Sequence, residues 1–87
     1  METSKRALRV DQSLECRSQS GPAVYAAAVK QLQDMAEDAV LELYLDEGEP
    51  LRTIPFALRA EGHEILISEP ANPGVRFLIR RRSLLSA

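Results

Sequence analysis

The sequence predicts a two-layer α/β (α+β) sandwich, in which two helices pack on one face of a four-stranded mixed sheet. Segments that alternate apolar and polar residues are separated by segments rich in helix formers, in the order strand, helix, strand, helix, strand, strand. The chain has 87 residues and 45% of them are hydrophobic, which suits one small core and excludes a disordered chain. We therefore expect a single domain over residues 1–87, ordered from about 7 to 82, with frayed tails.

The first strand is predicted by a period of two. One side of this segment carries, in order, Leu8, Val10, Gln12 and Leu14. The strand should end near Leu14 or Glu15, because the residues "CRSQSG" that follow are polar and typical of a loop.

The first helix is predicted for residues 22–38, "PAVYAAAVKQLQDMAED", which are rich in alanine and contain no internal helix breaker. Pro22 suits the first helical position, because an amide hydrogen would have no helical partner there. The side chains that share one stripe, and should therefore pack on the sheet, are Tyr25, Ala28, Val29, Leu32, Met35 and Ala36.

The second strand is predicted for "VLELYLD". The face that should be buried carries Leu41, Leu43 and Leu45. The opposite face carries Val40, Glu42 and Tyr44.

The second helix is predicted after a turn at "EGEPLR". In "TIPFALRAEG", Thr53 can cap the helix, and Pro55 then lies in its first turn. Gly62 can end the helix in a left-handed conformation. We therefore expect a short helix of about two turns.

Two further strands complete the pattern. "HEILIS" predicts the third strand, and "EPANPG" predicts a turn because it is rich in strand breakers. "VRFLIRR" predicts the fourth strand, with one face formed by Val75, Phe77 and Ile79.

Charge is unevenly distributed along the chain, although the net charge is only -2. Acids without any base lie between Gln31 and Leu51: Asp34, Glu37, Asp38, Glu42, Asp46, Glu47 and Glu49. Arginines without any acid follow from Val75 onward: Arg76, Arg80, Arg81 and Arg82. Either these are two solvated faces, or one of them docks a partner of opposite charge.

Composition also limits the compartment and the partners. A single cysteine cannot form an internal disulfide, so nothing requires an oxidising compartment. The segment "METSKRALRV" lacks the apolar core of a secretory signal, and no apolar run is long enough to span a bilayer. We therefore expect a cytoplasmic protein without a membrane partner.

Five short segments, taken in order, resemble the TusA family of small sulfur-carrier proteins, also called SirA-like or YhhP-like. They are "LECRSQSGP", "LDEG", "TIP", "GHE" and "FLIRR". The first is similar to the family pattern Leu-Asp-x-Arg-Gly-x-x-Cys-Pro-x-Pro, which precedes an amphipathic helix. The resemblance covers nearly the whole chain and implies the same order of strands and helices.

The resemblance places the family's reactive cysteine at Gly21 and its second proline at Val24. Cys16 falls on the variable position of the same pattern. In the family, the cysteine carries a persulfide sulfur from a cysteine desulfurase toward an acceptor protein. The amino terminus of a helix lowers the pKa of such a thiol, because its amide groups favour the thiolate. Glycine retains the helix cap but removes the nucleophile.

The resemblance therefore implies a degenerate member that is not an enzyme. We expect a protein-binding or regulatory module in sulfur relay or related metabolism, with a cysteine desulfurase or a relay acceptor as partner. The residues expected to bind that partner are Arg17, Gly21, Pro22, Asp46 and Glu47.

Two alternatives stay open. Cys16 could itself carry a persulfide, because five loop residues could span about 18 Å and Arg17 beside it could favour the thiolate. A free cysteine, however, often packs as a small hydrophobic residue. The second alternative is nucleic-acid binding through the strand from Arg76 to Arg82, against which stand a pI near 5.4 and few aromatic residues.

No metal or cofactor is expected. His63 is the only histidine, and no cysteine or second histidine has a spacing typical of metal ligands. Asp46 and Glu47 are adjacent on a strand end, so their side chains should point to opposite faces. Ser18 and Ser20 have no evident base to activate a hydroxyl group.

Overall fold

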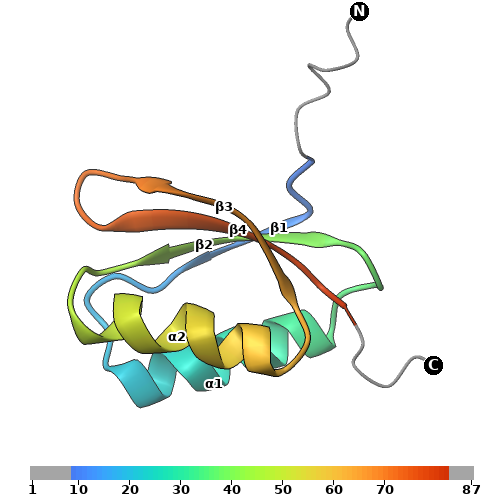
Figure 1. The fold of residues 1–87 in the computed structure, drawn as a ribbon, viewed down its shortest axis with the longest axis horizontal. Helices are drawn as coiled ribbons and strands as arrows, with labels where there is room; N and C mark the ends of the chain where they lie inside the picture. Colours follow the sequence, from blue (N-terminus) through green and yellow to red (C-terminus); the bar gives the residue numbers. More distant parts are fainter. Residues whose placement is uncertain (1–8, 83–87) are drawn as a thin grey trace, which may run out of the picture.

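Four strands form one mixed sheet, and two helices cover one of its faces, in the computed structural model, which describes residues 9–82 (Figure 1). The elements are β1 (Gln12–Glu15), α1 (Gly21–Gln33), β2 (Val40–Leu45), α2 (Glu49–Ala60), β3 (Glu64–Pro70) and β4 (Val75–Arg80). The predicted two-layer sandwich and the predicted order of elements are confirmed.

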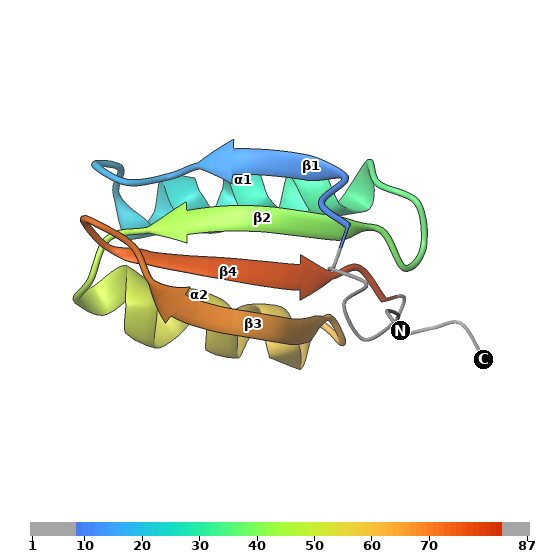
Figure 2. The same ribbon diagram turned by 90° about the horizontal axis from the view of Figure 1, so that it is seen from above.

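The strand order in the sheet is β1-β2-β4-β3. β1 pairs with β2 in parallel, whereas β2–β4 and β4–β3 are antiparallel. α1 lies below β1 and β2, and α2 lies below β4 and β3 (Figure 2). Because β1 and β2 run in the same direction, both helices begin at the end of the sheet where these two strands stop.

The core lies between the sheet and the helices. Its buried members on the sheet side are Leu41, Leu43, Leu45, Phe77 and Ile79, and those on the helices include Val24, Ala28, Leu32, Ile54 and Leu58. Removing one such leucine side chain from water is worth about 1.5–3 kcal/mol. A shift of β2 by one residue would turn its buried leucines toward the opposite face of the sheet, so their alternation favours the observed register of this strand.

α1 is shorter than its prediction. It ends at Gln33 instead of Asp38, and the Asp34 amide donates to the Lys30 and Gln31 carbonyls in the last turn. Asp38 has a φ of 70°, a left-handed conformation that aspartate tolerates better than most residues. Met35 still reaches the core from beyond the helix, but Ala36, which was predicted on the packing stripe, is exposed.

α2 is longer than its prediction, and its predicted start is wrong. The helix begins at Glu49 after Gly48, whose φ is 102°, and Pro50 lies in its first turn. Thr53 is therefore not the cap: its hydroxyl donates to the Glu49 carbonyl at 3.0 Å within the helix. Pro50 and Pro55 both suit a first turn, and the sequence pattern favoured the later of the two.

The end of α2 agrees with its prediction. Gly62 has a φ of 101°, and its amide donates to the Arg59 carbonyl at 2.9 Å. The His63 amide donates to the Leu58 carbonyl at 3.2 Å, so two carbonyls of the last helical turn are satisfied.

The strands also differ from their predictions in detail. β3 extends to Pro70, which was assigned to the turn, and it has a register shift between Ile65 and Ile67. Val40 and Leu78 are buried although they lie on the face away from the helices. Leu78 is central in the sheet, opposite Glu42 on one side and Ile67 on the other, and such neighbours shield it from water.

β1 ends at Glu15, as predicted, but it begins only at Gln12. Val10, which was predicted to belong to this strand, precedes it. Leu8 and the tails predicted to fray lie outside the described residues. Within residues 9–82, neither helix is long and apolar enough to cross a lipid bilayer.

Candidate functional site

Three connections meet at one end of the molecule, beside the starts of both helices (Figure 2). They are residues 16–20 after β1, residues 46–48 after β2 and the β3–β4 turn at 71–74. We call this region the loop end. The residues that the sequence nominated for binding a protein partner or for sulfur chemistry lie in it or at its border.

Gly21 is the first residue of α1, with Ser20 as the N-cap and Pro22 in second place. The Ser20 hydroxyl accepts a hydrogen bond from the Ala23 amide at 3.4 Å. A Cβ built on Gly21 would meet no neighbouring atom within 4 Å. The start of α1 is therefore a capped helix terminus with room for a side chain.

A cavity of about 370 Å³ opens beside Gly21, between the first turns of the two helices. We call it the α1–α2 pocket; it is lined by Gly21, Pro22, Tyr25, Glu49, Pro50, Thr53, Ile54 and Ala57. The Tyr25 hydroxyl donates to the Glu61 carboxylate at 2.8 Å, and this hydrogen bond raises the pKa of Tyr25. The pocket thus combines apolar walls with carboxylates at its border.

Cys16 is buried in the core, with 1% of its surface exposed. Its amide continues the β1–β2 pairing by donating to the Tyr44 carbonyl at 3.0 Å. Burial raises the pKa of the Cys16 thiol, and the negative charge of Glu15 raises it further. A thiol in this environment is protonated near neutrality and out of reach of a protein-sized reactant.

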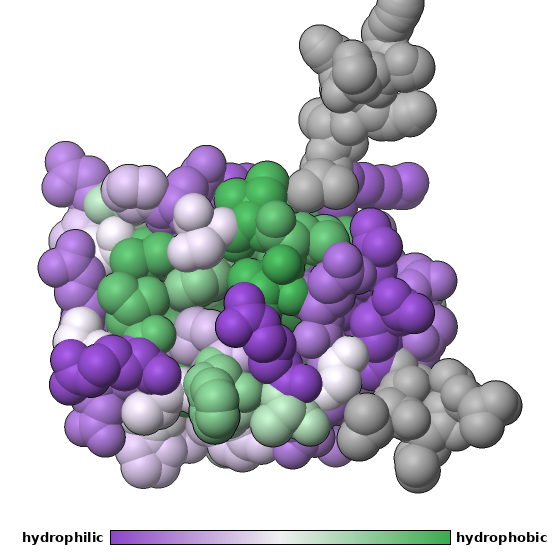
Figure 3. Space-filling view, in the orientation of Figure 1, coloured by the Kyte–Doolittle hydropathy of each residue, from purple (hydrophilic) through white to green (hydrophobic). Residues whose placement is uncertain are grey.

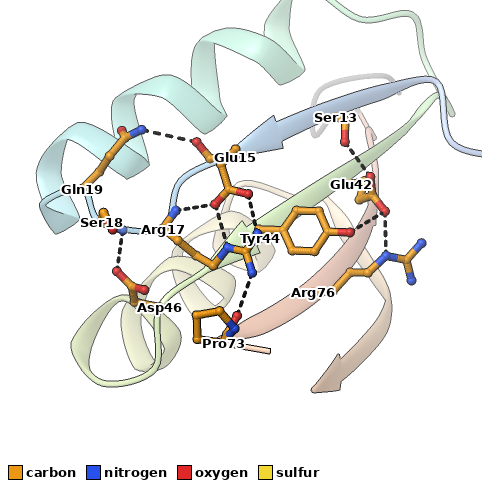
Figure 4. Close-up of polar contacts among 10 residues, drawn as sticks. All are labelled: Ser13, Glu15, Arg17, Ser18, Gln19, Glu42, Tyr44, Asp46, Pro73 and Arg76. Carbon is orange, nitrogen blue, oxygen red and sulfur yellow. Dashed lines mark hydrogen bonds and ion pairs between the residues drawn. The ribbon is translucent and has the colours of Figure 1, made fainter. Parts of the chain in front are cut away.

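Arg17 does not counteract this effect, because its guanidinium is committed to other groups (Figure 4). It forms two hydrogen bonds to the Glu15 carboxylate, Nε to Oε2 at 2.7 Å and Nη2 to Oε1 at 2.6 Å. These bonds lower the pKa of Glu15 to about 2. The Nη1 group donates to the Pro73 carbonyl at 2.8 Å, so Arg17 connects the end of β1 to the β3–β4 turn.

Asp46 and Glu47, the two predicted acidic binding residues, have different surroundings. Asp46 accepts a hydrogen bond from the Ser18 amide at 2.6 Å, and Ser18 is in a left-handed conformation with a φ of 72°. Asp46 therefore shapes the loop that precedes α1. Glu47 is exposed and, within residues 9–82, it has no ion pair.

The two charged runs seen in the sequence are partly paired with each other within the molecule. Arg76 pairs with Glu42 at 2.6 Å, and Arg81 pairs with Glu37 at 2.8 Å. Arg81 also donates to the Leu32 carbonyl at 2.6 Å near the end of α1. Arg76, Arg81 and Arg82 thus connect the end of the chain to the acidic segment, and Arg80 pairs with Glu64 of β3.

His63 has a structural contact: its Nδ1 accepts the Arg82 amide at 3.1 Å. Burial lowers the pKa of His63, and the positive charge of Arg81 lowers it further. In the described part of the chain, no group of three histidine, cysteine or carboxylate residues could hold a metal ion.

A family model described as sulfurtransferase TusA matches residues 12–81. The chain belongs to the TusA family. The match begins in β1 and ends just after β4, so it includes every helix and strand of the described chain. The comparison with curated proteins finds no match.

The sequence did not indicate one feature of this TusA-family site, the α1–α2 pocket. Tyr25 was assigned to the packing stripe, Pro50 to a turn and Thr53 to a cap, and no linear pattern brings these three together. α2 begins at Glu49, before the predicted cap at Thr53, and its first turns place Pro50 and Thr53 opposite the first turn of α1. The pocket lies between these two helix starts.

Proposed function

We propose that this TusA-family protein no longer transfers sulfur and acts as a protein-binding or regulatory module in sulfur relay or related metabolism, in the cytoplasm. One observation carries the proposal. The helix start, where the family resemblance requires a thiol, is Gly21, and the sole thiol, Cys16, is buried in the core.

The chemistry of sulfur transfer explains why these two positions matter. The carrier thiolate attacks the terminal sulfur of a partner persulfide, the S–S bond breaks, and the partner cysteine leaves as a thiolate. The attacking group must therefore be both ionised and exposed. The raised pKa and the burial of Cys16 oppose both requirements, whereas the first turn of α1 would satisfy them if it carried a thiol.

The loop end still offers a surface for a protein partner. Gly21 and Pro22 form one wall of the α1–α2 pocket, and Glu47 adds exposed negative charge nearby. Arg17 and Asp46 act on this surface indirectly, because they hold the loop between β1 and α1 in place. By family resemblance, the partner is a cysteine desulfurase or an acceptor of the relay.

The decisive experiment is the intact mass of the protein after incubation with a cysteine desulfurase and cysteine. We expect no mass gain for the native chain and a gain of one sulfur for Gly21→Cys, because a side chain fits at that position. The control combines Gly21→Cys with Cys16→Ala and should gain the same mass. A gain by the native chain that disappears in Cys16→Ala would overturn the proposal.

Partner binding is tested separately with the same desulfurase by titration calorimetry. The native chain should bind without accepting sulfur, and Glu47→Lys should weaken the complex because it reverses an exposed charge at the loop end. Gln33→Lys, an exposed position at the far end of α1, is the control and should bind as the native chain does. Absence of binding by the native chain would remove the desulfurase as partner.

The alternative function, nucleic-acid binding through the last strand, is not favoured by the contacts of its arginines. Within residues 9–82, each arginine from Arg76 to Arg82 has an ion pair with a carboxylate of the same chain. Phosphate contacts would have to displace these pairs.

A further inference from the structure

One stripe of α2 faces solvent without a partner in the described chain. Phe56 is 72% exposed, more than any other large hydrophobic side chain of residues 9–82. Arg52 precedes it by four positions and Arg59 follows it by three, which places all three on one side of the helix. We call Arg52, Phe56 and Arg59 the α2 stripe. Figure 3 views the molecule from the side of α2 and β3, where hydrophobic and strongly hydrophilic residues lie next to one another.

Both arginines of this stripe are exceptional in the described chain. Every other arginine of residues 9–82 has an ion pair with a carboxylate, and the pairs include Arg9–Asp11, Arg17–Glu15, Arg76–Glu42, Arg80–Glu64, Arg81–Glu37 and Arg82–Asp38. In the same range, Arg52 and Arg59 have none. Two uncompensated cations thus flank the most exposed aromatic ring.

The charge of the stripe indicates what can cover it. Two copies packed stripe against stripe would bring four arginines together, and like charges at an interface are strongly unfavourable. The complementary surface must instead offer an apolar recess for the phenyl ring and carboxylates at its border. An exposed aromatic residue beside arginines is the type of side-chain set that dominates binding energy at protein interfaces.

The same chain carries such a surface on the other flank of α2. The α1–α2 pocket has apolar walls that include Pro22, Pro50 and Ile54. Glu49 lines it, and Glu61 lies at the hydroxyl of Tyr25, another lining residue. Neither glutamate has a cation partner among residues 9–82. The stripe and the pocket therefore match in polarity and in sign of charge.

We propose that the α2 stripe of one copy docks into the α1–α2 pocket of a second copy. The Phe56 ring then lies between the apolar walls, and the two arginines lie near Glu49 and Glu61. The inference goes beyond the proposed function and does not depend on it. Because the two surfaces differ, the association is head-to-tail, and each pair retains one free stripe and one free pocket. Because the contact is built on one aromatic ring and two arginines, we expect the association to be transient.

The test uses sedimentation velocity of the purified protein at rising concentration and low salt. The mean mass of the native chain should rise with concentration, pass the mass of a pair, and fall again at high salt. Phe56→Asp and, as a second stripe variant, Arg59→Glu should stay monomeric. Thr53→Arg, which places a cation in the pocket, should do the same. The control is Gln33→Asp, at an exposed residue at the end of α1, which should associate as the native chain does.

Mixing the variants provides the sharpest outcome. Phe56→Asp retains an intact pocket and Thr53→Arg retains an intact stripe, so an equimolar mixture should form a one-to-one pair that grows no further. Circular dichroism of each variant verifies that it is folded. The inference is overturned if the native chain stays monomeric at millimolar concentration, if Phe56→Asp associates as the native chain does, or if the mixture forms no pair.

Discussion

The guanidinium of Arg17 lies over the ring of Tyr44, with its Cζ atom 4.6 Å from the ring centroid. Arg17 is the second residue of the connection between β1 and α1, and Tyr44 belongs to the neighbouring strand β2. A cation over an aromatic face is attracted by the ring, by about 0.5–1 kcal/mol at an exposed site. Together with the bonds to Glu15 and Pro73, this contact fixes the segment that leads into α1.

Removal of the Arg17 guanidinium should change the titration of Glu15. The pKa of Glu15 is lowered from 4.5 to about 2, first by the side-chain hydrogen bond from Arg17. A lowered pKa means that the ionised group stabilises the fold above pH 4.5 and that this stabilisation is lost as the pH falls toward 2. In Arg17→Gln we expect Glu15 to titrate closer to 4.5, measured by NMR of its side-chain carboxyl carbon. A native Glu15 that already titrates near 4.5 would contradict the geometry.

Replacement by alanine should destabilise the protein at Gly74 but not at Gly21. Gly74 has a φ of 89°, and a Cβ there would clash with the Leu45 carbonyl and lie 3.2 Å from Cδ of Arg17. Gly74→Ala should therefore lower the free energy of unfolding by about 1–3 kcal/mol. Gly21→Ala, where a Cβ meets nothing, should change it by less than about 0.5 kcal/mol. Urea unfolding of both variants checks the difference, and equal losses would contradict it.

Cys16 should be protected from thiol reagents in the native state. Its side chain is 1% exposed and its pKa is raised by burial, so both access and ionisation are unfavourable. We expect slow labelling by iodoacetamide near neutral pH and fast labelling in urea. In a Cys16→Ala background, Gly21→Cys should label faster than a free cysteine. Rapid native labelling of Cys16 would show that the core opens at this point.

The contact of His63 should make stability depend on pH. The Nδ1 atom accepts the Arg82 amide only when the imidazole is neutral, and burial and Arg81 lower its pKa from 6.5. Glu61 and Glu37 act in the opposite direction, but less strongly. Because the folded pKa is the lower one, stability is complete above pH 6.5 and declines as the pH falls through the folded value. His63→Leu should remove this part of the decline in urea unfolding between pH 8 and pH 5.

The sequence was sufficient for the elements whose signals are local. The alternation of Leu41, Leu43 and Leu45 gave the buried face of β2, and Gly62 gave the end of α2. It failed where two local signals competed, as with Pro50 and Pro55 at the start of α2. Which proline lies in the first turn of α2 depends on tertiary packing, and local helix propensity carries no information about packing.

The site was less predictable because its contacts join distant residues. Glu42 and Arg76 are 34 positions apart, and Glu37 and Arg81 are 44 apart, so the sequence shows two charged runs but not their pairing. The resemblance located Gly21, yet the burial of Cys16 and the pocket beside Gly21 required coordinates. Composition alone could not show that each arginine of the run is paired with a carboxylate of the same chain.

The anchoring of the segment between β1 and α1 has a consequence for a thiol introduced at position 21. This segment is held on one side by Asp46 and on the other by the Pro73 carbonyl, through partners that do not involve position 21. The anchors therefore do not depend on the side chain at position 21, where a Cβ would meet no neighbouring atom. If the proposed function holds, a single glycine-to-cysteine replacement would place a thiol on an already capped helix terminus, and laboratory selection for sulfur transfer should favour that change.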